Sequence, residues 1–142
     1  PQWLLEGNAD WSGTAATFHE NYSDFLRLRN LSLENQYANP KTFTSEWIKT
    51  FLNPNFQALK GQNNWAYWEK YDHWYVYAIG QMVNEILVSL KGPESVMNLY
   101  LDSGNGMTFV DAFQKEFGMP WSDAINYISQ AIEAELKQSV KS

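Results

Sequence analysis

Residues 75–93 read YVYAIGQMVNEILVSLKGP and give the clearest indication of the fold class. Its apolar positions recur every three or four residues, which is the spacing of one face of an α-helix. The repeat continues upstream, so the predicted helix spans about 65–91. Its main apolar stripe comprises Trp68, Tyr71, Tyr75, Ile79, Met82, Val83, Ile86 and Leu90. Gly92 suits a left-handed cap at the end of this helix, and Pro93 blocks its continuation while fitting the first turn of the next.

The same periodicity predicts helices on both sides of this stretch. The predicted helices are, in chain order, 3–17, 18–31, 44–52, 65–91, 93–101, 108–117 and a last helix from Pro120 through Leu136, whose stripe is Trp121, Ala124, Ile125, Ile128, Ile132 and Leu136. Thr108 and Asp111 suit the start of a helix that Gly118 ends, and residues 102–106 read as a turn. No segment alternates apolar and polar residues as a half-buried strand would. The prediction is an all-α, irregular multi-helix bundle, with residues 1–142 forming a single helical domain.

Composition and charge restrict the classes of function. The chain has 142 residues, with ten basic and sixteen acidic side chains and a net charge of -6. Only Arg27 and Arg29 lie close together among the basic residues, whereas a nucleic-acid surface needs clustered positive charge, so no nucleic-acid partner is expected. No apolar run reaches the roughly 18 residues of a membrane span. The sequence leaves export and a cytoplasmic location equally open.

Residues 1–10, PQWLLEGNAD, hold the strongest functional signal. Glu6 stands among apolar residues, and Asp10 follows one helical turn later, so both carboxylates share a helix face. A carboxylate on an apolar face needs a cation or several hydrogen-bond donors. No Lys or Arg precedes Arg27. A bound metal would meet this need, with Glu6 as its ligand and Asp10 supporting the site from behind.

The segment from Trp3 to Ala9 resembles the third-ligand helix of the gluzincin metallopeptidases, which often reads W-L-x-E-G-x-A. In that superfamily an HExxH helix supplies two zinc histidines and a general-base glutamate, and a later helix supplies the third ligand. The resemblance places Glu6 at the ligand position and Asp10 where some members carry an acid that orients a zinc histidine. Residues 109–118, FVDAFQKEFG, resemble the F-x-x-A-F-x-x-x-F-G helix of many bacterial members.

The chain also departs from the gluzincin pattern, because it contains no HExxH. The nearest match is 19–23, HENYS, which has Ser in place of the second His and follows Glu6 instead of preceding it. Two His and no Cys cannot form an ordinary three-ligand zinc site alone. The resemblance therefore implies the C-terminal helical half of a larger, bacterial, zincin-like metallopeptidase. Zinc, a peptide or protein substrate and the missing N-terminal catalytic half would belong to the intact protein, and this chain alone would be inactive without bound metal.

Three further residues are candidates for the catalytic site. Gluzincins often carry a Tyr or His, on the helix after the third ligand, that donates to the oxyanion of the tetrahedral intermediate. The resemblance makes His73, Tyr75 and Tyr77 candidates for this role. The competing interpretation is that the tyrosines pack in the core and that His73 lies at the surface.

Residues 65–77 contain seven aromatic side chains and suggest a different class of function. Tyr67, Trp74 and Tyr77 point away from the main stripe of the predicted helix, so both of its sides are apolar. Such a helix is either buried on all sides or offers one side to a missing part of the protein, a partner or a sugar. The alternatives to a peptidase half are therefore a non-catalytic helical module that binds a protein or a glycan, and a pseudopeptidase that keeps only the fold.

Overall fold

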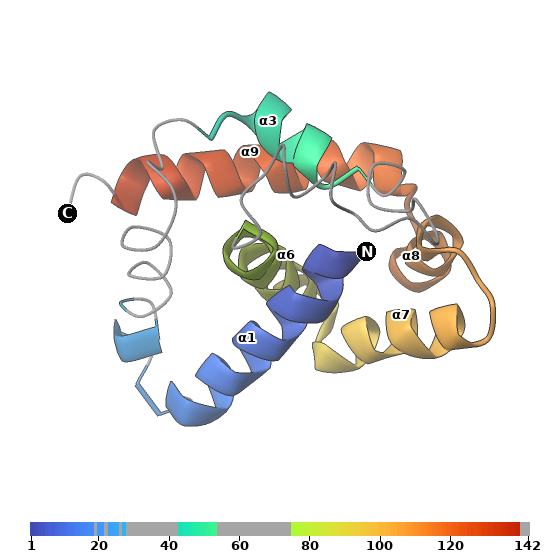
Figure 1. Cartoon of the computed structure of the whole chain (residues 1–142), viewed down its shortest axis with the longest axis horizontal. Coiled ribbons are helices and arrows are strands. Elements are labelled where there is room, and N and C mark those ends of the chain that lie inside the picture. Colours follow the sequence, from blue (N-terminus) through green and yellow to red (C-terminus); the bar gives the residue numbers. More distant parts are fainter. Residues whose placement is uncertain (19, 22, 26, 28–42, 54–74, 140–142) are drawn as a thin grey trace.

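The computed structural model describes residues 1–18, 20–21, 23–25, 27, 43–53 and 75–139 (Figure 1). Its helices are α1 (Gln2–Phe18), α3 (Ser45–Phe51), α6 (Tyr75–Lys91), α7 (Pro93–Gly104), α8 (Phe109–Phe117) and α9 (Trp121–Ser139). The described residues contain no strand, which confirms the predicted all-α class. Much of the predicted helix 18–31 and the stretch 65–74 lie outside the described residues.

Helix α6 is the centre of the arrangement. Helix α1 crosses α6 diagonally, and α9 passes over α6. Helix α3 lies along the outer side of α9 (Figure 1). Helices α7 and α8 follow α6 in the chain and pack against each other. Within the described residues, no helix has both the length and the apolarity that crossing a membrane requires.

The helix ends follow the local sequence signals. Gly92 adopts a φ of +83°, and its N–H donates to the carbonyl of Val88 at 2.7 Å, so the predicted cap of α6 is confirmed. Thr108 caps α8 by accepting from the N–H of Asp111 at 3.2 Å, and Gly118 ends the same helix in the left-handed conformation. Each of these devices acts within a single turn of backbone, which explains why the sequence predicts them.

Helix α7 is longer than predicted. It continues to Gly104, whereas the sequence placed a turn at 102–106. The carboxylate of Asp102 lies 2.7 Å from the ammonium of Lys115 on α8, so the added turn of α7 is joined to α8 by an ion pair. The N–H of Asn105 then closes the helix on the carbonyls of Leu101 and Asp102.

The core joins all the described helices. Its members are the buried residues Trp3, Leu4, Phe43, Ile48, Phe51, Leu52, Ile79, Met82, Val83, Leu87, Val96, Leu99, Ala112, Phe113, Trp121, Ala124, Ile125, Ile128, Ile132 and Leu136. The predicted stripe of α9 is buried along its whole length, as expected. On α6 the prediction is wrong at Leu90, which is 68% exposed, while Leu87 is fully buried. Helix α6 packs against α1 and α7 as well as α9, so its buried face is centred nearer Val83 and Leu87.

Candidate functional site

The backbones of α1 and α6 touch where the two helices cross. A Cβ atom added to Gly7 would lie 2.0 Å from the carbonyl carbon of Gly80, and one added to Gly80 would lie 2.2 Å from the carbonyl oxygen of Trp3. No side chain fits between the helices at this point, so both positions require glycine. The glycine that follows Glu6 in the sequence therefore has a packing role, and it sets Glu6 at the edge of the helix crossing.

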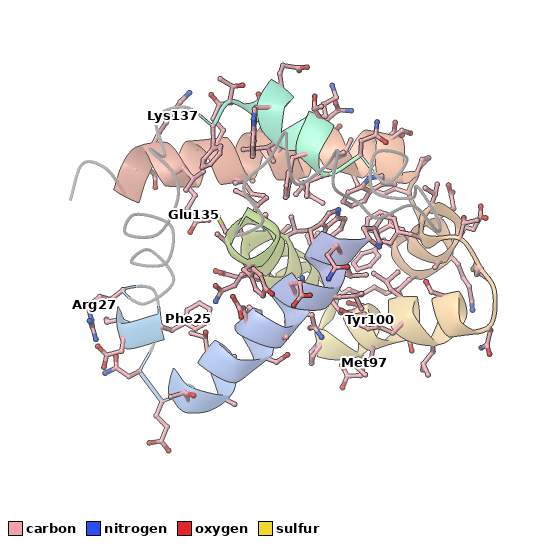
Figure 2. The ribbon with its side chains drawn as sticks, in the orientation of Figure 1. Phe25, Arg27, Met97, Tyr100, Glu135 and Lys137 are labelled. Atoms are coloured by element: carbon pink, nitrogen blue, oxygen red, sulfur yellow. The ribbon has the colours of Figure 1, made fainter. Side chains whose placement is uncertain are left out.

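Two side chains reach the backbone of α1 beside this crossing. The hydroxyl of Tyr100 donates to the carbonyl of Leu4 at 2.8 Å, as its position between α7 and α1 allows (Figure 2). The amide of Asn84, which is fully buried, donates to the same carbonyl at 3.4 Å and to the carbonyl of Gly80 at 2.8 Å. The first turns of α1 are thus tied to both α6 and α7.

The carboxylate of Glu6 is hydrogen-bonded on this side of the molecule. It is half-buried, and it accepts from the side-chain amide of Gln2 one turn earlier and from the hydroxyl of Tyr77 on α6. The pKa of Tyr77 is raised, mainly by burial and then by the negative charge of Glu6 and the hydrogen bond to it. Two neutral donors, Gln2 and Tyr77, therefore supply part of the stabilisation of Glu6 for which the sequence suggested a cation.

Asp10 shares the helix face of Glu6, as the four-residue spacing predicted. Burial raises the pKa of Asp10, and the negative charge of Glu6 raises it further, because the two carboxylates repel each other. The residue as a whole is nevertheless exposed. The apolar face that the sequence suggested for the two carboxylates is therefore wrong for Asp10, whereas Glu6 is partly covered; the buried apolar side chains of this segment are Trp3 and Leu4.

The structure brings only some of the sequence-predicted site residues together. Tyr77 lies beside Glu6. His73 and the side chain of Tyr75 lie outside the described part of the chain, as does the aromatic run 65–74. Within the described ranges, no group of three or more His, Cys, Asp or Glu side chains could hold a metal ion. Glu6 and Asp10 therefore supply at most part of a metal site.

Sequence reasoning missed three members of this polar cluster. Gln2 lies one turn before Glu6, and this spacing would have been enough to suggest it as a partner. Asn8 and Tyr100 hydrogen-bond to each other, and Tyr100 is 96 residues away from the carbonyl it binds. No local pattern in the sequence identifies a partner at that separation.

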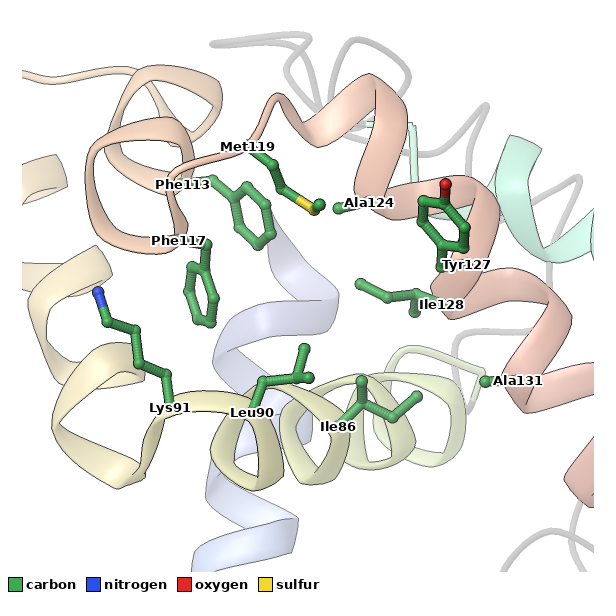
Figure 3. Close-up of a pocket in the computed structure, with 10 residues that line it drawn as sticks. All are labelled: Ile86, Leu90, Lys91, Phe113, Phe117, Met119, Ala124, Tyr127, Ile128 and Ala131. Carbon is green, nitrogen blue, oxygen red and sulfur yellow. The ribbon is translucent and has the colours of Figure 1, made fainter.

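A pocket of about 450 Å³ lies elsewhere, between α6, α8 and α9 (Figure 3). Its lining is almost entirely apolar and consists of Ile86, Leu90, Lys91, Phe113, Phe117, Met119, Ala124, Tyr127, Ile128 and Ala131. Lys91 provides the one charged group of this lining, and its ammonium lies 3.2 Å from the carboxylate of Glu116 and 5.9 Å from the centre of the Phe117 ring. The pocket shares no residue with the polar cluster around Glu6.

The chain matches no protein-family model, no curated protein and no solved structure.

Proposed function

We propose that this chain contributes Glu6 as a zinc ligand to a metallopeptidase whose zinc histidines come from a segment outside residues 1–142. One observation carries the proposal: a half-buried glutamate has a tyrosine hydroxyl as its partner and, among the described residues, no ion pair with a cation. A carboxylate beside a phenol is a suitable pair for a catalytic zinc site, because one can bind the metal while the other donates to the substrate. The resemblance of residues 3–9 to the third-ligand helix supports the same assignment.

Each residue of the pair has a separate role in this proposal. Zinc bound by Glu6 and two histidines would lower the pKa of its bound water and polarise the peptide carbonyl. The hydroxyl of Tyr77 remains protonated at neutral pH, because burial and the charge of Glu6 raise its pKa above the usual 10.0. It can therefore donate a hydrogen bond to the developing oxyanion. Asp10, one turn from Glu6, is placed to orient a zinc-bound histidine.

The proposal is tested first in the source gene and then in the intact protein. An HExxH motif a few tens of residues upstream of Pro1 is required, and a gene without one would contradict the assignment. In the purified intact protein, Glu6→Gln should abolish peptidase turnover and weaken zinc retention by more than about tenfold. Glu46→Gln is the matched control, because Glu46 is an exposed glutamate in the first turn of α3. Unchanged zinc content and turnover in Glu6→Gln would refute the role of Glu6.

Tyr77→Phe separates catalysis from metal binding. Loss of one oxyanion donor typically lowers kcat by about 10²–10³-fold. We expect a fall of this size with zinc content and KM nearly unchanged, since the phenyl ring is retained. A variant that keeps full kcat would remove Tyr77 from the mechanism while leaving Glu6 as a ligand.

A second candidate function is a non-catalytic binding module, and the apolar pocket favours it. A volume of about 450 Å³ lies within the roughly 300–1,000 Å³ range of small-molecule sites. Because Lys91 is already paired with Glu116, the pocket suits an uncharged apolar ligand. A neutral fluorescent probe, N-phenyl-1-naphthylamine, should gain fluorescence with the wild-type chain. Ala131→Phe, within the lining, should abolish this gain, whereas Ala134→Phe on the exposed surface of α9 should not. Equal signals from both variants would remove the pocket from consideration.

A further inference from the structure

We propose that Tyr100 is a positioning residue that holds the turn of α1 on which Glu6 lies. This inference rests on the proposed role of Glu6 and names a residue that sets the position of its carboxylate. Tyr100 contacts α1 at two points. Its hydroxyl donates to the carbonyl of Leu4 at 2.8 Å, and it is hydrogen-bonded to the side chain of Asn8. One phenol on α7 therefore binds groups two residues before and two residues after Glu6.

The direction of the Asn8 bond follows from the one hydrogen that the Tyr100 hydroxyl has to donate. Because that hydrogen goes to the carbonyl of Leu4, the phenol oxygen accepts from the amide N–H of Asn8, and this bond lowers the pKa of Tyr100. The amide oxygen of Asn8 faces the hydroxyl of Ser12 at 3.5 Å, which is consistent with that orientation. Burial and the charge of Glu6 nevertheless raise the pKa of Tyr100 to about 12. The hydroxyl thus keeps its proton and donates to Leu4 while it accepts from Asn8.

The placement of Tyr100 on the helix explains why it can fix Glu6. Residues 4 and 8 are one turn apart on a helix, and residue 6 points to roughly the opposite side. Tyr100 therefore contacts this turn of α1 on the side opposite Glu6, while Gly80 of α6 contacts the same turn at Gly7. Tyr77, also on α6, binds the carboxylate in front. The first turns of a helix fray unless tertiary contacts hold them, and Tyr100 supplies such a contact from a distant helix.

The test measures the Glu6–Tyr77 hydrogen bond without any metal. The chain is labelled with ¹³C at the ζ carbon of tyrosine, whose resonance responds to hydrogen bonding of the phenol, and spectra are recorded at neutral pH. Tyr77→Phe assigns the Tyr77 signal, and Glu6→Gln defines its position when the carboxylate is absent. Tyr100→Phe should shift the Tyr77 signal towards its Glu6→Gln position. Tyr127→Phe is the matched control, because Tyr127 is 69% exposed on α9, and it should leave that signal in place.

A Tyr77 signal unchanged in folded Tyr100→Phe would overturn the inference, because a purely structural role would lower stability without moving Glu6. Should Tyr100→Phe not fold, Asn8→Ala removes one of the two contacts and should produce a smaller shift in the same direction. An unchanged signal in Asn8→Ala would then count against the inference. Because the measurement needs no zinc, it separates this inference from the proposed function. In the intact protein, Tyr100→Phe should weaken zinc retention less than Glu6→Gln does.

Discussion

Two helix contacts in this molecule are built in opposite ways. Helices α1 and α6 meet backbone to backbone at Gly7 and Gly80, with no space for a side chain between them. Helices α6, α8 and α9 are separated by large side chains, including Phe113 and Phe117, and a pocket of about 450 Å³ remains between them (Figure 3). Close approach brings backbone carbonyls within reach of side-chain donors, which allows a polar cluster to form. Bulky aromatic packing gathers apolar surface but leaves a hollow.

Trp3 connects the two contacts. Its carbonyl lies against Gly80, and its ring stacks on Trp121 with centroids 5.5 Å apart and planes at 18°. The same ring meets Phe109 edge-on at 5.5 Å and 86°. Trp121 in turn meets Phe113 edge-on at 4.9 Å. A change at the glycine contact should therefore also disturb the aromatic cluster.

The largest effect is expected from Gly7→Ala. The new methyl group would lie 2.0 Å from the Gly80 backbone, so the helices must separate, and the free energy of unfolding should fall by about 3 kcal/mol. Gly13→Ala is the matched control on the same helix, because nothing lies within 4 Å of its added Cβ. That variant should gain up to about 1 kcal/mol from helix propensity. Urea unfolding followed by circular dichroism measures both, and equal stabilities would show that the backbone contact is not rigid.

A smaller effect is expected from Phe113→Leu in the aromatic contact. The ring is almost fully buried and stacks on Phe117 at 4.6 Å, but it borders the pocket, so neighbouring side chains have space to adjust. The expected loss is about 1.5 kcal/mol. Val110→Leu, at an exposed site of the same helix, should stay within about 0.5 kcal/mol of the wild type. A loss in Phe113→Leu as large as in Gly7→Ala would abolish the distinction between the two contacts.

The smallest effect is expected at the contact between α3 and α9, which is neither a backbone contact nor a pocket. Glu133 accepts from the ammonium of Lys137 and from the N–H of Ser45 at 2.7 Å, and these bonds lower its pKa from 4.5 to about 2. Because the folded-state pKa is the lower one, the stabilisation exists above pH 4.5 and is lost as pH falls towards 2. The melting temperature of Glu133→Gln should lie below that of the wild type at pH 7 and approach it at pH 2.5.

Glu94→Gln, at an exposed site in the first turn of α7, is the control for this pH dependence. Its melting temperature should differ from that of the wild type by a similar amount at both pH values. A result in which the melting temperatures of Glu133→Gln and the wild type differ as much at pH 2.5 as at pH 7 would contradict this prediction. It would show that the charge of Glu133 does not stabilise the contact between α3 and α9.

The sequence predicted what depends on neighbouring residues. The caps at Gly92 and Thr108 were identified correctly, because each is completed within one turn. The buried stripe of α9 was also correct, since this helix presents one face to the core and its periodicity is regular. Leu90 was misplaced because α6 has three packing partners, and an apolar stripe alone does not tell which part of a surrounded helix ends at the surface.

In the candidate site, too, some features follow from local sequence and others from tertiary packing. The helical class and the shared face of Glu6 and Asp10 could both be predicted from residue spacing alone. The contact of Gly7 with Gly80, the hydrogen bond from Tyr77 to Glu6, and the hydrogen bond from Tyr100 to a carbonyl 96 residues away are visible only in the tertiary structure. Helix periodicity and capping arise from groups within a turn of each other and can be recognised locally. Close approach of helices and the hydrogen bonds it permits depend on packing between segments that the sequence does not order in space.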